Sequence, residues 1–277
     1  MYEIFLRLGI VVLAMLVVGL VTIVGLDRIR RLRSSWRMRL RVGLPVLLLL
    51  LGVLAFNGIA RQAVPHLSWI VGVEISDTLY LIEGSFVGSL QTVSHPALTA
   101  YFSYIYVYGY VFLLVFPLAA YFLLDSLDSF RATVWAYIFN YTLGLVCYIV
   151  FIAYGPRNII PDLAEPLMYS SFPDYQLLTR EVNRNTNVFP SLHTSLSVTA
   201  LLLAYRTRSQ YPRWLPVAAV LAVSVVIATM YLGIHWATDV VAGVVLAWVS
   251  VRLGIAMANR SWWNWQVPRG LSLERRG

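Results

Sequence analysis

A succession of apolar runs, each about as long as a bilayer-spanning helix, is the feature that most constrains the fold of this chain. A helix rises about 1.5 Å per residue, so roughly 20 apolar residues cross the ~30 Å hydrocarbon core of a bilayer. The runs do not alternate apolar and polar residues as barrel strands do. The sequence therefore predicts an all-α, polytopic transmembrane helical bundle, with spans at about 4–26, 43–62, 98–124, 130–153, 189–205, 214–232 and 236–258.

The composition agrees with this class, because 59% of the residues are hydrophobic and 12% are charged. Soluble domains have about 45–50% apolar and 25% charged residues. The net charge of +8 comes with no lysine, and most arginines lie between apolar runs, where a topology signal explains them without a nucleic-acid partner. The single cysteine, Cys147, lies within an apolar run, so we expect neither an intrachain disulfide nor a Cys-based zinc site.

The arginines also predict an orientation in the membrane. The segment 27–41 holds seven of them, and we interpret it as a cytoplasmic loop under the positive-inside rule. Strict alternation of the spans then puts the amino terminus outside and the carboxyl terminus inside. This interpretation divides the chain into an N-terminal span with its Arg-rich loop, a six-helix membrane domain and a cytoplasmic tail, at 1–42, 43–258 and 259–277.

Alternation also predicts which segments lie on the non-cytoplasmic side. These are 62–96, 154–188 and the turn at 233–234, and all four histidines lie on or beside them. The charged and aromatic residues of the first segment suggest an amphipathic helix in the membrane interface, with a cap over a site as its functional alternative. His66 and His95 are isolated, and we interpret both as structural or interfacial residues.

His193 and His235 differ from these because each begins a span on the same predicted side. His193 follows Pro190-Ser191-Leu192, and the free N–H groups of a helix that starts there would favour an anion such as phosphate near Ser191. His235 and Asp239 are four residues apart and share one helix face. Asp239 can thus hold one imidazole nitrogen and leave the other for nucleophilic or general-base work, though a structural role for both histidines stays open.

Two histidines and an aspartate could also bind zinc or iron. No further ligand is evident in the sequence, and the spacing between His235 and Asp239 serves orientation equally well. We therefore predict a site without metal or organic cofactor.

At these residues the sequence resembles the type 2 phosphatidic acid phosphatase superfamily of membrane phosphoesterases. That family shows Lys-x6-Arg-Pro, then Pro-Ser-Gly-His, then Ser-Arg-x5-His-x3-Asp on a six-helix core. Here the second motif ends at His193, and the third ends with His235 and Asp239. The resemblance implies that His235 is the nucleophile, that Asp239 orients it, and that His193 protonates the leaving oxygen. Arg157 and Ser191 are the predicted phosphate-binding residues.

The departures from the family motifs point to a branch of it. Thr229 stands where the third motif has Arg, Leu192 replaces Gly, and the first motif is reduced to Arg157 with a preceding proline and Val150 in place of Lys. This weakens the expected phosphate clamp. The pattern is similar to the branch that contains fungal inositol phosphorylceramide synthase, which implies that the group is transferred to water or to a polyol such as inositol.

The sequence thus predicts an integral-membrane enzyme that cleaves a phosphate ester of a lipid through phosphohistidine. Its expected partners are a membrane lipid and, where the group is not passed to water, a polyol acceptor. The oligomeric state is left open. One alternative is a plain lipid phosphatase acting on phosphatidate or an isoprenyl phosphate. Another is a lipid or proton-coupled transporter, against which the scarcity of ionisable residues deep within the spans argues.

Overall fold

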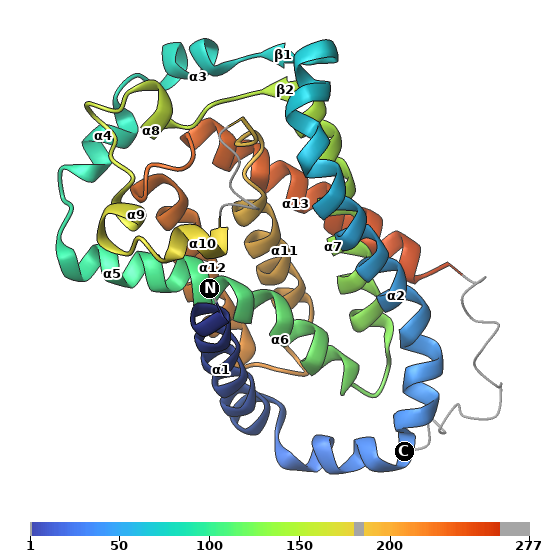
Figure 1. The fold of residues 1–277 in the computed structure, drawn as a ribbon. Coiled ribbons are helices and arrows are strands. Elements are labelled where there is room, and N and C mark those ends of the chain that lie inside the picture. Colours follow the sequence, from blue (N-terminus) through green and yellow to red (C-terminus); the bar gives the residue numbers. More distant parts are fainter. Residues whose placement is uncertain (1, 180–185, 261–277) are drawn as a thin grey trace.

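The computed structural model describes residues 2–179 and 186–260, which form a bundle of helices (Figure 1). The amino-terminal helix is α1 (Tyr2–Gly19), which continues into a π-helical turn, η1 (Leu20–Val24). The other long elements are α2 (Leu26–Val71), α5 (Pro96–Tyr104) continued by η2 (Ile105–Gly109) and α6 (Tyr110–Phe122), α7 (Asp128–Val150), α11 (Leu192–Arg206), α12 (Trp214–Tyr231) and α13 (Ala237–Ala258).

Six helical stretches of the described residues are long and apolar enough to cross a membrane. They are Tyr2–Val24, Leu26–Val71, Pro96–Phe122, Asp128–Val150, Trp214–Tyr231 and Ala237–Ala258. This confirms the predicted all-α polytopic bundle. The span predicted at 189–205 forms α11, which has only 15 residues and lies inside the bundle against α7, α12 and α13.

The Arg-rich segment 27–41 was expected to be a loop, and that expectation is wrong. It forms the first part of α2, which runs across one end of the bundle before turning along α7 (Figure 1). Gly25, at φ +87°, ends the preceding helix, and the segment after it contains mainly Arg and Leu, which are strong helix formers. The positive-inside rule assigns a side of the membrane and carries no information on secondary structure.

Arginines tie the first part of α2, and the turn η1 before it, to neighbouring chain segments. The Arg39 Nη1 donates to the carbonyl oxygens of Phe122, the last residue of α6, and of Leu124, at 2.9 and 2.5 Å. Arg213, before α12, donates to the carbonyl oxygen of Thr22 at 3.0 Å. The chain segments before α2, α7 and α12 therefore lie together at one end of the bundle, while the side of the membrane that this end faces stays a prediction.

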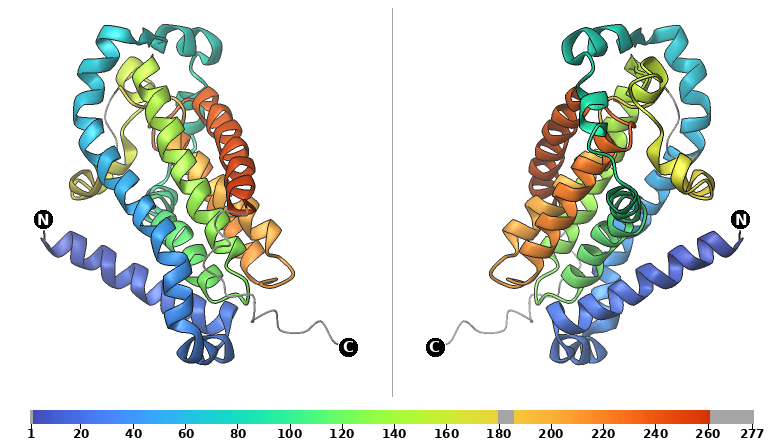
Figure 2. Two further views of the ribbon diagram at one scale, coloured as in Figure 1. Left: turned by 90° about the vertical axis from the view of Figure 1, so that its right-hand side faces the viewer. Right: turned by 90° about the vertical axis from the view of Figure 1, so that its left-hand side faces the viewer.

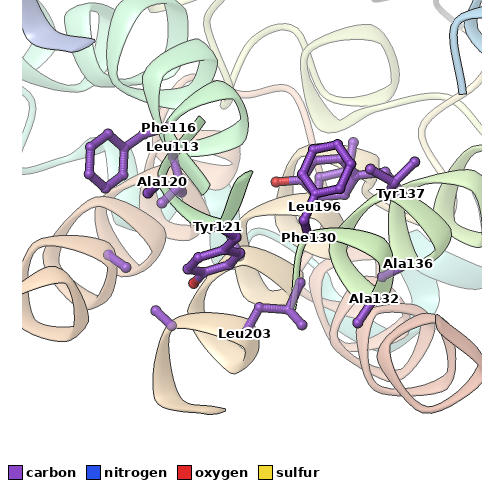
Figure 3. Close-up of a cluster of buried hydrophobic side chains, with 14 of the residues drawn as sticks. Leu113, Phe116, Ala120, Tyr121, Phe130, Ala132, Ala136, Tyr137, Leu196 and Leu203 are labelled. Carbon is purple, nitrogen blue, oxygen red and sulfur yellow. The ribbon is translucent and has the colours of Figure 1, made fainter. Parts of the chain in front are cut away.

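The main apolar core lies between α6, α7, α11 and α12 (Figure 3). Its fully buried members include Phe116, Tyr121 and Leu196. The helices α7 and α13 approach closely, because a Cβ added at Gly254 would lie 2.7 Å from the carbonyl oxygen of Ala132. By contrast α1 lies at the edge of the bundle, at an angle to the central helices (Figure 2), and buries little of its apolar surface although it contacts α6 and η2.

The opposite end of the bundle is built from short elements (Figure 1). They are the parallel strands β1 (Val73–Glu74) and β2 (Phe151–Ile152), and the helices α3 (Ser76–Glu83), α4 (Phe86–Gln91), α8 (Pro156–Ile159), α9 (Leu167–Ser171) and α10 (Tyr175–Thr179). The segment 62–96 therefore holds several pieces where one amphipathic helix was expected. Gln91, the last residue of α4, joins this helix to the segment before α9 and to the end of α12. Its Nε2 donates to the carbonyl oxygens of Glu165 and Tyr231 at 2.9 and 2.8 Å.

Candidate active site

His235 lies in a tight turn between α12 and α13. Gly233 adopts φ +72°, and the backbone N–H groups of Ile234 and His235 both donate to the carbonyl oxygen of Thr229 at 3.1 and 3.0 Å. Asp239 lies in the first turn of α13 with its Oδ2 3.4 Å from His235 Nδ1. The same oxygen accepts from the backbone N–H of Trp236 at 2.8 Å. The expected contact between imidazole and carboxylate is present, and both side chains are buried.

His193 is the second residue of α11. The helix begins after Ser191, whose Oγ accepts from the Thr194 N–H at 3.3 Å as an N-cap, so Pro190 lies just before the cap and outside the first helical turn. The backbone N–H of Ser191 donates to the carbonyl oxygen of Asp239 at 3.0 Å. This bond joins the starts of α11 and α13, and with them the two histidine-bearing segments.

Two tyrosines hold the His193 ring. Tyr106 stacks on it with ring centroids 4.4 Å apart, and Tyr110 packs against it at the same centroid distance. The Tyr106 hydroxyl lies 3.3 Å from His193 Nδ1. Because Nδ1 has this partner, Nε2 is the nitrogen available for a ligand.

His193 and His235 line one pocket. Its other walls come from α2, α6, α7, α11 and the segment before α11, through Arg61, Tyr110, Tyr141, Tyr148, Asn187, Leu192 and Leu196. The structure therefore brings together the two imidazoles that the sequence placed on separate helices, with Asp239 in contact with one of them.

The two predicted phosphate ligands lie elsewhere. The Arg157 guanidinium lies over the Tyr169 ring, 5.0 Å from its centroid, and Arg157 is not among the residues lining the pocket. Its backbone N–H donates to the carbonyl oxygen of Gly233 at 3.2 Å, so this residue supports the turn before His235. Ser191 is a buried helix cap and does not line the pocket. Their roles toward phosphate stay predictions.

The other two histidines occupy positions outside this pocket. His95 is the N-cap of α5, where its Nδ1 accepts from the Ala97 N–H at 3.2 Å. His66 is exposed on α2. Within the described ranges, no group of three or more His, Cys, Asp or Glu side chains is arranged to hold a metal ion.

Sequence reasoning missed two charged residues near the site. Arg61 lines the pocket from α2, is 7% exposed, and places its guanidinium 5.2 Å from the centroid of the Tyr148 ring. An arginine at the end of an apolar run, far from the other arginines, was the available signal. Glu83, at the end of α3, accepts hydrogen bonds from the backbone N–H groups of Ala237 and Thr238. Nothing in the local sequence indicated this long-range cap.

A second, largely apolar pocket meets the first at His193 and Tyr110, which line both. Leu8 of α1 and Leu178 of α10 contribute to it from two sides. Val107 and Val111, with Tyr106 and Thr179, complete the lining. His193 therefore separates a polar cavity from an apolar one.

The fold and the site together define a class of protein: a polytopic helical bundle with two imidazoles on one buried pocket, one of them in contact with a carboxylate. Residues 79–253, more than half of the chain, match the PAP2 superfamily, and the chain belongs to this superfamily. The match includes both histidines and Asp239. No curated protein and no solved structure was found to match the chain.

Membership confirms the predicted type 2 phosphatidic acid phosphatase superfamily and supports a phosphoesterase of the lipid phosphatase type. The matched range begins within α3, so α1 and α2 lie outside it. Arg61 and Leu8 are therefore contributed by parts of the chain that precede the matched region.

Proposed function

We propose that this protein cleaves a phosphate ester of a membrane lipid through a phosphohistidine formed at His235, and passes the phosphoryl-containing group to water or to a polyol such as inositol. One observation carries the proposal: His193 and His235 line the same pocket, while Asp239 Oδ2 lies 3.4 Å from the Nδ1 of His235. An imidazole held at one nitrogen by a carboxylate presents the other as a nucleophile.

The first step would be attack of His235 Nε2 on phosphorus, which forms a P–N bond. The P–O bond to the lipid alcohol breaks, and the leaving oxygen takes a proton from the protonated His193. In the second step His193 removes a proton from the acceptor hydroxyl, whose oxygen attacks phosphorus and releases His235. Asp239 stabilises the positive charge that the His235 ring gains during the first step.

The second pocket supports a lipid as the leaving alcohol. It opens on the residue proposed to protonate the leaving oxygen, and Leu8, Val107, Val111 and Leu178 make its walls apolar. A hydrocarbon chain attached to that oxygen would lie among these side chains, where each buried CH₂ contributes about 0.8 kcal/mol. The phosphate would remain in the polar pocket on the opposite side of His193.

A turnover assay with the purified full chain in liposomes tests the proposal. Labelled phosphatidate, an isoprenyl phosphate and phosphatidylinositol are supplied with and without inositol or glycerol, and both inorganic phosphate and phosphorylated polyol are measured. We expect His193→Ala, His235→Ala and Asp239→Asn to lose most turnover while remaining folded. The matched control is His66→Ala, which removes an exposed histidine on α2 and should leave turnover unchanged.

An activated substrate separates the two histidine roles. A nitrophenyl phosphate ester has a leaving group that departs without protonation, so it should restore the first step in His193→Ala but leave His235→Ala inactive. Turnover that survives His235→Ala would overturn the proposal and favour the transporter alternative. If inorganic phosphate is released and neither inositol nor glycerol becomes phosphorylated, the protein is a plain lipid phosphatase.

A further inference from the structure

The position that carries arginine in the family's third motif cannot supply a cation to this pocket. Thr229 occupies it and is fully buried. Its hydroxyl donates to the carbonyl oxygen of Val226 at 2.7 Å, and its carbonyl oxygen accepts from the N–H groups of Ile234 and His235. Thr229 therefore shapes the turn before His235. A phosphoryl group in the pocket would need its donors from other elements.

Arg61 brings a permanent positive charge to the pocket from α2. It lies in a membrane-spanning helix and is 7% exposed. A charge at such a position is costly and by default marks a functional site. The Tyr148 ring below the guanidinium is itself fixed, because its hydroxyl donates to the carbonyl oxygen of Pro190 at 3.3 Å, two residues before α11 begins. Arg61 is thus held beside the start of the helix that carries His193.

Asn187 brings a second donor to the pocket from the segment before α11. It is 5% exposed and lines the same pocket, and its backbone pairs with Ala153 in an isolated bridge. The amide oxygen accepts from the Thr186 hydroxyl at 3.3 Å. The Nδ2 is buried and has no hydrogen-bond partner in the part of the chain that the structure describes. Buried donors are nearly always satisfied, so an unsatisfied one on a residue that lines a cavity indicates a ligand contact.

We propose that Arg61 and Asn187 bind the phosphoryl oxygens of the substrate, in place of the arginine that the third motif lacks. The proposal rests on the proposed phosphoesterase function. Arg61 supplies charge and a planar pair of N–H donors that fit two phosphate oxygens, while Asn187 supplies a neutral N–H. Because Arg61 precedes the residues matched to the superfamily, the phosphate site extends beyond the conserved motifs into α2.

Four variants of the full chain test this assignment: Arg61→Gln, Arg61→Lys, Asn187→Ala and Arg41→Gln. The last removes an exposed arginine from the same helix and serves as the matched control. Each is assayed for kcat and KM with the best lipid phosphate and for inhibition by orthovanadate, which resembles the phosphoryl group in transfer. Thermal unfolding in detergent is measured in parallel.

Loss of one preorganised donor commonly lowers turnover by about 100-fold or more. We expect a loss of this size for Arg61→Gln, a smaller loss for Asn187→Ala, and partial recovery in Arg61→Lys, which keeps the charge but not the paired N–H groups. Vanadate inhibition should weaken in the same order and stay unchanged in Arg41→Gln. A purely structural Arg61 would instead lower the unfolding temperature while leaving vanadate inhibition at the wild-type level.

The failure of this assignment can be told apart from failure of the function itself. If the wild type turns over lipid phosphate in a His235-dependent manner, and Arg61→Gln and Arg61→Lys match it in kcat/KM and vanadate inhibition, the assignment is overturned and the function stands. If the wild type neither turns over a lipid phosphate nor binds vanadate, the proposed function fails first. If Arg61→Gln does not fold, kcat/KM and vanadate inhibition of Arg61→Lys and Asn187→Ala, compared with the wild type, test the assignment instead.

Discussion

Glu83 holds the start of the helix on which the proposed nucleophile depends, and its replacement should weaken the fold measurably. The carboxylate accepts from the backbone N–H groups of Ala237 and Thr238, across more than 150 residues of sequence. These N–H groups belong to the first turn of α13 and have no acceptor within the helix. A negative charge at this end also interacts favourably with the helix dipole.

The expected loss in the free energy of unfolding for Glu83→Gln follows from these contacts. Glu83→Gln keeps one oxygen acceptor and turns the other into an NH₂ group that faces a backbone N–H. One hydrogen bond to a charged acceptor is worth about 1.5–3 kcal/mol, and the helix-dipole interaction about 0.3–1 kcal/mol. Glu83 is only half-buried, so water replaces part of the loss, and relief of repulsion with Asp239 offsets some more. We expect a net loss of about 1–2 kcal/mol in the free energy of unfolding.

Denaturant unfolding in mixed micelles, followed by tryptophan fluorescence, measures this difference. Asp77→Asn is the matched control, because it removes the same charge from an exposed position on the same short helix. Turnover should fall in Glu83→Gln as well, since the turn holding His235 joins directly onto the first turn of α13. If Glu83→Gln and Asp77→Asn unfold at the same denaturant concentration, the cap contributes nothing and the reasoning is refuted.

Three further substitutions test other contacts. Asp239→Asn should lower turnover about ten-thousandfold with little change in the unfolding temperature, because an amide can present an N–H to His235 and favour the wrong tautomer; single-turnover kinetics measure the rate of the first step. Gly155→Ala should lower both the unfolding temperature and turnover, since its Cβ would collide with the carbonyl oxygen of Ile234. Asn140→Ala should lower the free energy of unfolding by about 1–3 kcal/mol. The buried Ser195 hydroxyl of α11, which donates to the Asn140 side chain, would lose its acceptor.

The fold class and the contact between His235 and Asp239 could be predicted because both depend on local sequence. Apolar runs of spanning length define the helices, and a spacing of four residues fixes two side chains on one face whatever the surroundings. His193 and His235 share a pocket through contacts between residues far apart in the sequence. This arrangement could be expected only because the order of the motifs resembles a known family.

The roles of Arg61 and Glu83 could not be assigned from the sequence, because their contacts are long-range. Each acts on residues far along the chain, and neither lies in a motif. The isolated position of Arg61 at the end of an apolar run was a signal, but it was passed over because a topology signal explains most other arginines of the chain. Arg157 shows the reverse situation, because a motif-like context suggested a phosphate ligand, whereas its guanidinium lies over the Tyr169 ring and Arg157 is not among the residues lining the pocket. Its role toward phosphate stays a prediction.

The short elements at the histidine end of the bundle do more than cover it. The first turn of α13 is held from three directions: by Glu83 from α3, by the Ser191 N–H on the carbonyl oxygen of Asp239, and by the Trp236 Nε1, which donates to the carbonyl oxygen of Tyr154 at 2.8 Å. A nucleophilic imidazole must be positioned to a fraction of an ångström. Since His235 itself lies in a turn outside any helix, these three supports of α13 add to the hydrogen bonds within the turn in fixing its position. The short elements that carry Glu83 and Tyr154 therefore help to position the proposed nucleophile.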